Sequence, residues 1–247
     1  MNKFFVPSSG VTADKIIIED YDEAHHIRDV LRLKVGEKVA AFDDQGNEYL
    51  CVIESVEDKI HLDIKKRLAA ANYDEKFQLT VACAIPKKAK IDDIIDKLVQ
   101  LGVERIIPLR TERVIVKLDK QKEASRSERW KKIALSAVKQ CKRNSLAVVE
   151  RVRDLEDLVK NSSEFDLKLI PYLEGERKSL KSILDKASSS APVKVLILIG
   201  PEGDFSPEEV ILAKANGFIP VTLGDLVLRV DTAAIAASSF IKLYAHR

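Results

Sequence analysis

The sequence predicts two folds in one chain: a small, mostly β, barrel-like domain followed by a larger parallel α/β domain. Short strands separated by turn residues fill the chain up to residue 68. After residue 77, apolar strands alternate with amphipathic helices, the pattern of a parallel α/β sheet. Two glycine-marked loops follow strands near the C-terminus. We therefore expect domains over residues 1–72 and 73–247, joined near residues 69–74.

The first domain is predicted from alternation and turn chemistry. Strands are expected over residues 4–6, 15–18, 38–42, 48–56 and 59–66. Gly36 and the 43–47 segment supply the turns between them. One short helix is expected over residues 23–31, with an apolar face that includes Val30.

The second domain is predicted from helical spacing between apolar runs. Strands are expected over residues 77–85, 103–109, 166–173, 193–199 and 220–223. Helices are expected over residues 91–101, 180–187 and 232–245, and a further helix is expected to start after Ser127. Gly102 is placed as the C-terminal cap of the first of these helices.

Composition describes an ordinary globular protein, because 46% of the 247 residues are hydrophobic and 32% are charged. No apolar run is long enough to span a bilayer, and the first residues lack the apolar core of a signal peptide. A cytoplasmic protein is therefore expected. Cys51, Cys83 and Cys141 lie far apart with no Cys/His cluster, so we expect buried free thiols and no metal site.

Charge is distributed unevenly along the chain. Residues 1–72 hold 10 Lys and Arg against 14 Asp and Glu, whereas residues 105–153 hold 15 against 5. Clustered cations suit a polyanion such as nucleic acid, because neutralised phosphates release their counterions. A solvated helix face would give the same composition, and both readings stay open.

The first loop, IGPEGDFSPEE, covers residues 199–209 and follows an apolar strand. Gly200 and Gly203 can take positive φ and let the backbone approach a ligand closely. Ser206 and Glu209 form a predicted capping box that starts the next helix. Neither a P-loop nor a GxGxxG pattern is present, and Glu202 and Asp204 would repel a pyrophosphate. The expected ligand is neutral or cationic.

The second loop, LGDLVLRVDTA, covers residues 223–233 and precedes an Ala-rich helix. Asp231 is the expected N-cap of that helix. Arg229 is the only cation in the loop; it either pairs with Asp231 or Glu202 or contacts nucleic acid. Because both loops follow strands, they are expected to form one small-molecule site at the carboxyl ends of neighbouring strands.

The segments IGPEGDFSPEEV and LGDLVLRVDTAAIAA resemble the cofactor site of the SPOUT class of S-adenosylmethionine-dependent RNA methyltransferases. The resemblance continues through KKAKIDDIIDKLVQLGVERIIPLRTERVIV and SERWKKIALSAVKQCKR. HHIRDVLRLKVGEKVAAFDDQGNEY resembles the PUA-like RNA-binding β-barrel domain of the RsmE-type enzymes. Those enzymes methylate N3 of a uridine in 16S ribosomal RNA, in the small subunit.

The resemblance implies a C-terminal α/β domain with a trefoil knot, a homodimer and S-adenosyl-L-methionine as cofactor. The resemblance places Leu173 at the cofactor, in a third loop over residues 171–174. On the methionine and ribose side it places Ile199, Gly200, Pro201 and Gly203. At the adenine it places Leu223, Gly224, Val227, Leu228, Thr232 and Ala233. Three positions depart from the family pattern: Asp204 replaces a glycine, Leu226 an arginine and Asp231 a glutamate.

Catalysis of uridine N3 methylation needs a cation near O2 or O4 and a proton acceptor, because the N3 proton must leave. Our hypothesis gives these roles to Arg229 and Glu202. The expected partner is small-subunit ribosomal RNA, free or in the assembled 30S subunit. The residues expected to bind RNA are Arg28, Arg32, Arg113, Lys139, Lys142 and Arg143.

Three other functions stay open at this point. The chain could be a SPOUT enzyme acting on a ribose 2′-oxygen or a guanosine N1. It could be a non-catalytic RNA-binding protein that retains the fold. A glycine-loop phosphate enzyme is the third alternative.

Overall fold

The computed structural model describes residues 1–68, 77–86, 90–113, 120–141, 143, 145–187 and 193–245. It divides into two compact units, which are described separately. The first comprises Met1–Tyr73 with Val138–Leu146, and the second comprises Asp74–Ala137 with Ala147–Arg247.

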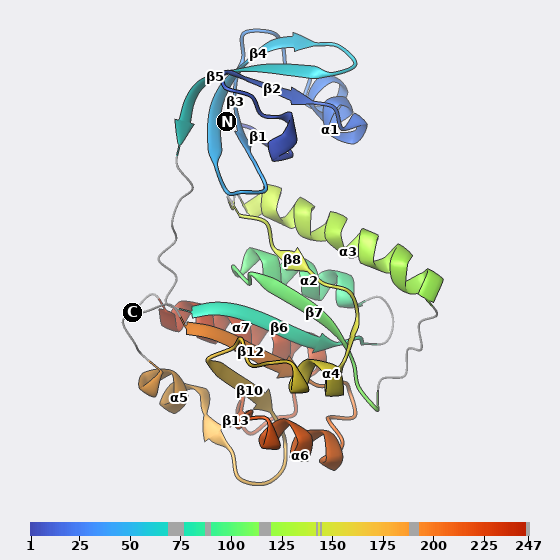
Figure 1. Ribbon diagram of the computed structural model, residues 1–247, viewed down its shortest axis with the longest axis vertical. Coiled ribbons are helices and arrows are strands. Elements are labelled where there is room, and N and C mark those ends of the chain that lie inside the picture. The colour runs from blue at the N-terminus through green and yellow to red at the C-terminus, as the bar shows by residue number, and fades with distance from the viewer. Residues whose placement is uncertain are drawn as a thin grey trace. The chain divides into compact units, whose positions relative to one another are not determined.

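The first unit contains one five-stranded sheet (Figure 1). Its strands are β1 (Lys3–Phe5), β2 (Lys15–Ile18), β3 (Lys38–Phe42), β4 (Glu48–Val56) and β5 (Ile60–Leu68). The order is β1-β3-β4-β5-β2, with a parallel β1–β3 pair and antiparallel pairs elsewhere. β2, β3 and β4 have the predicted bounds. The sheet buries a core that includes Phe4, Ile16, Val39, Ile53 and Leu62.

The helical segment of this unit differs from the prediction. A short 3-10 helix, η1 (Ser8–Gly10), precedes it. The α-helix α1 (Tyr21–His25) starts at the N-cap Asp20, and the chain then continues as a π-helical turn, η2 (His26–Val30). A π-turn is wider than an α-turn. Val30 is therefore rotated off the apolar face on which it was predicted, and its side chain is exposed.

The turn between β3 and β4 is organised by one buried carboxylate. Asp43 is 1% exposed and accepts hydrogen bonds from the backbone N–H groups of Gln45 and Asn47, at 2.9 and 2.8 Å. It also accepts from Asn47 Nδ2 at 2.9 Å and from the buried Tyr49 hydroxyl at 2.7 Å. Burial, followed by the hydrogen bond to Asp43, raises the pKa of Tyr49 to about 12.

The second unit is built on a sheet in which every strand pair is parallel. The strands are β6 (Phe77–Ala84), β7 (Arg105–Arg110), β8 (Val148–Val149), β9 (Arg153–Asp154), β10 (Leu167–Pro171), β11 (Lys178–Ser179), β12 (Val193–Ile199) and β13 (Ile219–Thr222). Their order is β11-β13-β10-β12-β6-β7-β8, and β9 also pairs with β7. A parallel α/β domain is thereby confirmed.

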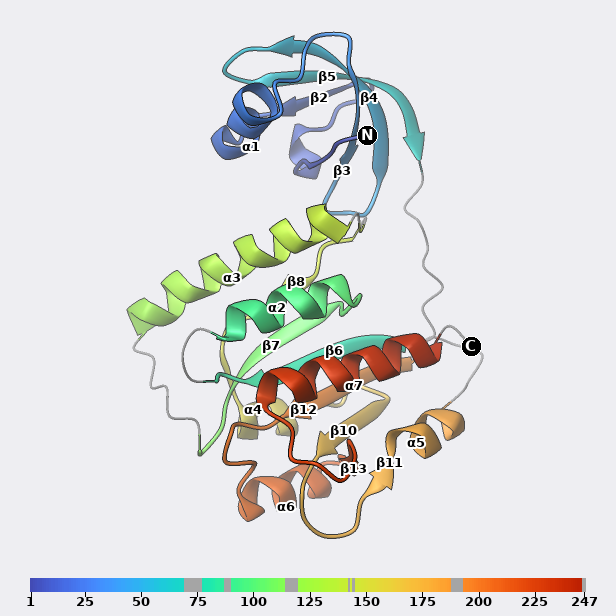
Figure 2. The same ribbon diagram turned by 180° about the vertical axis from the view of Figure 1, so that it is seen from behind.

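Helices cover both faces of this sheet. The helices of the second unit are α2 (Lys90–Gln100), α4 (Leu155–Lys160), α5 (Leu180–Lys186), α6 (Pro207–Ala215) and α7 (Val230–Ala245), and α3 (Lys120–Cys141) belongs to it as far as Ala137. α2 and α7 pack against each other and α7 lies on β6 (Figure 2). α4 and α6 pack on the opposite face, where Leu158 and Val210 join a core with Leu196 and Leu198 of β12.

Two predicted helix starts were wrong. α3 begins at Lys120, so Ser127 lies inside the helix and is buried. The residues before Ser127 are mostly good helix formers, which lets the helix extend in the N-terminal direction. α7 begins at Val230, which places Asp231 in its first turn rather than at the N-cap. Asp231 there faces the positive end of the helix dipole.

The end of α7 is anchored to the sheet by a buried ammonium group. Lys242 is 6% exposed, and its Nζ lies 2.8 Å from Glu104 Oε1. Glu104 Oε2 accepts from the backbone N–H of Leu79 on β6 at 2.7 Å. Gly102 has a φ of +85°, and a Cβ there would lie 3.1 Å from Lys242 Cε. Only a residue without a Cβ fits this turn.

The cysteines are free thiols, as predicted. Cys51 and Cys83 are buried and Cys141 is half-buried. Burial raises the pKa of Cys51 to about 11. Across the described ranges, no helix combines the length and apolar character needed to cross a membrane, and no group of three or more His, Cys, Asp or Glu side chains is placed to hold a metal.

Candidate functional site

Three loops meet at one edge of the large sheet. They follow β10, β12 and β13, which are parallel and lie side by side in the order β13-β10-β12. The two glycine loops were expected to follow neighbouring strands. They do not, because β10 lies between β12 and β13, and its own loop after Pro171 becomes the middle of the site. Carboxyl ends of parallel strands are where open α/β sheets bind ligands.

These loops line a cavity that opens to solvent. The predicted cofactor residues that line it are Leu173, Ile199, Gly200, Pro201, Leu223, Gly224, Val227, Leu228 and Ala233. Gly203 lines an adjoining cavity instead, and Thr232 lies on the exposed side of α7. The two cavities share Tyr172, Leu173, Glu202 and Asp204.

The positive φ of the first loop lies at neither of its glycines. Gly200 and Gly203 have ordinary φ values, whereas Asp204 has a φ of +59°. Gly200 is needed for space instead. A Cβ at Gly200 would lie 3.1 Å from Phe205 Cε2 and 3.3 Å from Asp204 Oδ1. Aspartate is one of the few residues with a side chain that enters the left-handed region at modest cost.

Asp204 connects two of the three loops. Its Oδ2 accepts from the backbone N–H of Leu173 at 3.2 Å, and its Oδ1 accepts from that of Phe205 at 2.8 Å. Its own N–H donates to Pro201 O at 3.0 Å. The carboxylate therefore ties the loop after β10 to the loop after β12.

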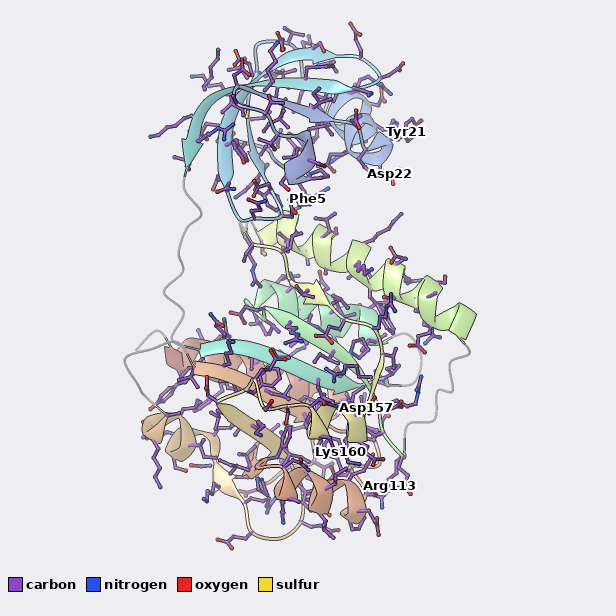
Figure 3. The ribbon with its side chains drawn as sticks, in the orientation of Figure 1. Phe5, Tyr21, Asp22, Arg113, Asp157 and Lys160 are labelled. Carbon is purple, nitrogen blue, oxygen red and sulfur yellow. The ribbon has the colours of Figure 1, made fainter. Side chains whose placement is uncertain are left out.

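Arg113 holds the same loop from its other side. The residue follows the end of β7, and its side chain is labelled in Figure 3. Its Nη1 donates to Gly203 O at 2.7 Å and lies 3.5 Å from Phe205 O. Both acceptors flank Asp204 in the chain. The guanidinium predicted to contact RNA thus stabilises the first loop.

The cavity is electronegative on one side, because Glu202 and Asp204 both line it. Burial raises the pKa of Asp204, although the N–H groups of Phe205 and Leu173 and the charge of Arg113 oppose the shift. Burial and the neighbouring carboxylates of Glu174 and Asp204 raise the pKa of Tyr172. Such surroundings favour a cationic or neutral ligand over an anion, as the sequence predicted.

The second loop places Arg229 beside the cavity rather than in its lining. Its carbonyl accepts from the N–H of Ala233 at 2.8 Å and so starts α7, while its side chain is exposed. Within the described ranges, Arg229 forms no ion pair. Val230 and Ala233, from the first turn of α7, complete this wall of the cavity.

Most of the remaining residues predicted to bind RNA belong to the first unit. Arg32 is exposed, with a φ of 53°. Arg28 donates to Asp29 Oδ2 at 3.0 Å and to Glu57 O at 2.9 Å. Lys139 is half-buried and paired with the buried carboxylate of Glu23. Arg143 donates to Ser145 Oγ at 2.8 Å. The prediction for Lys142 lies outside the described residues.

Several lining residues were not predicted as cofactor contacts. They are Arg177, Asp204, Val221, Thr222, Leu226 and Val230. Pro171 and Tyr172 also line the cavity and belong to the third loop that the resemblance implied. Arg177 reaches the site from the loop after β10 and lies 3.4 Å from Tyr172 O. Leu226 is 78% exposed at the mouth of the cavity. The order β13-β10-β12 gives the loop after β10 the central place between the other two loops.

The fold and the site define an α/β ligand-binding domain whose cavity lies across adjacent parallel strand ends. Sequence comparison identifies the family to which this domain belongs. Residues 73–242 match the family described as RNA methyltransferase domain, and residues 18–67 match the RNA methyltransferase PUA domain. The chain belongs to this RNA methyltransferase family, and the predicted fold class is confirmed.

Individual relatives are similar to this chain over most of its length. The chain is 31% identical to ribosomal RNA small subunit methyltransferase E of Bacillus subtilis over 223 residues, which cover 89% of this chain and 87% of that protein. The enzyme of the same name from Rickettsia conorii is 29% identical over 98% of this chain and 95% of its own. The enzyme of this name from Neisseria gonorrhoeae, solved with bound S-adenosyl methionine, superimposes with a TM-score of 0.86 at 26% identity, covering 99% and 98% of the two chains.

Proposed function

We propose that this protein transfers a methyl group from S-adenosyl-L-methionine to N3 of a uridine in 16S ribosomal RNA. The observation that carries the proposal is the cavity formed by three loops at the carboxyl ends of β10, β12 and β13. Family membership and the similarity to named small-subunit ribosomal RNA methyltransferases support the reaction and the substrate.

The cavity residues suit this cofactor. Leu223, Val227 and Leu228 offer apolar surface for an adenine, and Gly200 leaves room that a Cβ would fill. Glu202 and Asp204 also line the cavity, and their negative charge suits the sulfonium and ammonium groups of the cofactor. When bound, the cofactor supplies an electrophilic methyl group, so that the protein's main contribution is to position the reacting atoms.

Arg229 and Glu202 are the proposed catalytic residues. Arg229 is exposed next to the cavity and would stabilise the negative charge that develops on O2 or O4 of the uridine. Glu202 is exposed and lines both adjoining cavities, where it could accept the N3 proton directly or through water.

Replacing Arg229 with alanine is expected to reduce kcat for methyl transfer about a hundredfold, because one donor to a developing anion is lost. Cofactor affinity should stay within about twofold, since Arg229 does not line the cavity. Single-turnover kinetics and calorimetry measure the two effects. Arg151→Ala removes an exposed arginine elsewhere in the same unit and serves as the control. An Arg229→Ala protein with full transfer activity would contradict the assignment.

RNA recognition is proposed for the domain over residues 1–72, with the methyltransferase domain over residues 73–247. In the domain over residues 1–72, Arg28 and Arg32 are the cations proposed to contact RNA. The matches to residues 18–67 and 73–242 support this division. Because the first 72 residues carry more acidic than basic groups, they are better suited to reading RNA shape than to binding phosphates non-specifically.

The direct test uses small subunits and naked 16S RNA from cells that lack the endogenous modification. Each is incubated with the protein and labelled cofactor, and the product nucleoside is identified by mass spectrometry. We expect 3-methyluridine at a single position. A 2′-O-methyl nucleoside or 1-methylguanosine would overturn the assigned atom, and absence of label from both substrates would overturn the proposed function.

We also propose that the protein is a homodimer formed through α7. Ala236, Phe240 and Leu243 recur at helical spacing along the exposed side of this helix. Phe240 is 41% exposed and Leu243 is 69% exposed. Large apolar side chains gathered on one surface are typical of protein interfaces.

Leu243→Asp is expected to convert the dimer to a monomer, because an ionised carboxylate would be desolvated in the interface. Sedimentation equilibrium should give a mass of roughly twice the 27.6 kDa chain for the unmodified protein and that of one chain for the variant. Ile211→Asp replaces a side chain of similar exposure on α6 and should leave the dimer intact. A Leu243→Asp protein that keeps the mass of two chains would rule out α7 as the interface.

A further inference from the structure

We propose that Asp204 is a positioning residue that holds the loop after β10 against the loop after β12 and thereby shapes the methyl-donor site before the cofactor binds. The inference rests on the proposed function and adds to it a residue that acts through its neighbours. Three observations support the inference: the hydrogen bonds of the Asp204 carboxylate, the backbone conformation of Asp204 and the close packing around Gly200.

The carboxylate bonds join segments that are distant in sequence. Leu173 N–H and Phe205 N–H lie on different loops, and each donates to a different oxygen of Asp204, at 3.2 and 2.8 Å. Leu173 lines the cavity and is 44% exposed, so burial alone does not fix its position. A charged acceptor gives stronger hydrogen bonds than a neutral one. The position of Leu173 at the mouth therefore depends on this side chain.

The backbone and the packing agree with this role. Asp204 has a φ of +59°, where a glycine would be less strained. The carboxylate of Asp204 therefore contributes hydrogen bonds that a glycine at this position could not form. Asp204 Oδ1 also lies close enough to Gly200 to restrict a Cβ there, at 3.3 Å. Arg113 fixes the carbonyls of Gly203 and Phe205 on either side of Asp204. The loop is thus held by two side chains of opposite charge.

A series of variants separates the carboxylate from the backbone. Asp204→Gly relieves the positive φ and removes both hydrogen bonds, whereas Asp204→Asn keeps a residue that tolerates this φ and one acceptor oxygen. We expect the dissociation constant and the KM for S-adenosylmethionine to rise about tenfold in Asp204→Gly and by less in Asp204→Asn. The kcat should stay within about twofold, because both carboxylate oxygens of Asp204 are occupied by the N–H groups of Leu173 and Phe205. Asp225→Asn removes an exposed carboxylate of the second loop and is the control for charge alone.

Amide hydrogen exchange tests the connection without any cofactor. In Asp204→Gly the amide of Leu173 should exchange at least tenfold faster, while the amide of Tyr172, which donates to Val221 O at 3.2 Å, should keep its rate. An Asp204→Gly protein with unchanged cofactor affinity and unchanged Leu173 exchange would overturn the inference. If the unmodified protein neither binds the cofactor nor transfers methyl groups, the proposed function fails. The exchange of Leu173 still decides whether Asp204 positions the loop.

Discussion

Gly200→Ala is expected to weaken S-adenosylmethionine binding about thirtyfold. Its Cβ would lie 3.1 and 3.2 Å from two ring carbons of Phe205, which is 1% exposed and cannot move freely. Overpacking of this kind costs about 2 kcal/mol. If the strain is relieved by displacing the loop that lines the cavity, this free energy corresponds to the thirtyfold loss of cofactor affinity. Calorimetric titration with the cofactor measures the effect.

Gly203→Ala is the matched control for this prediction. The two glycines lie in the same loop and neither has a positive φ. A Cβ at Gly203 would come no closer than 3.6 Å to Arg113 Cδ, which is ordinary van der Waals contact. Its cofactor affinity should therefore stay within about threefold of the unmodified protein. Equal losses in both variants would show that the loop needs glycine for a reason other than space around Phe205.

Asp43→Ala should lower the free energy of unfolding by about 3 kcal/mol, because several polar groups lose their common acceptor. The Tyr49 hydroxyl is the most costly of these, since Tyr49 is 3% exposed. The turn between β3 and β4 would also lose the bonds from Gln45 and Asn47. Urea denaturation followed by far-ultraviolet circular dichroism measures the change.

Asp44→Ala provides the comparison at the next residue. Asp44 is exposed and accepts a hydrogen bond from the backbone N–H of Ser8 at 2.7 Å. That bond lowers the pKa of Asp44, yet water can replace it when the side chain is removed. The expected loss is below about 1 kcal/mol. If Asp43→Ala were as stable as Asp44→Ala, the buried carboxylate would not be what organises the turn.

Local patterns in the sequence predicted local structure well. The strands at residues 15–18, 38–42, 48–56 and 193–199 have the predicted bounds, because alternation or a continuous apolar run ends at a clear turn. The capping box of Ser206 and Glu209 is present, with both reciprocal bonds formed. These features depend on neighbours within a few residues, which a sequence displays directly.

Features that depend on distant contacts were missed. Nothing near residue 171 indicates that β10 lies between β12 and β13, since strand order follows from how the helices pack. The positive φ of the first loop occurs at Asp204 rather than at either of its glycines, and the carboxylate of Asp204 binds an N–H group 31 residues away. The catalytic roles of Glu202 and Arg229 and the trefoil knot stay predictions.

The anchoring of α7 has a consequence for how this sequence can change over evolutionary time. Lys242 and Glu104 form an ion pair with 2.8 Å between the nitrogen and the oxygen, so a substitution at either position removes the contact that both side chains share. Gly102 has a positive φ and requires glycine whichever residue occupies position 242. Positions 104 and 242 are therefore expected to vary together between lineages, although they are separated by 138 residues in the chain.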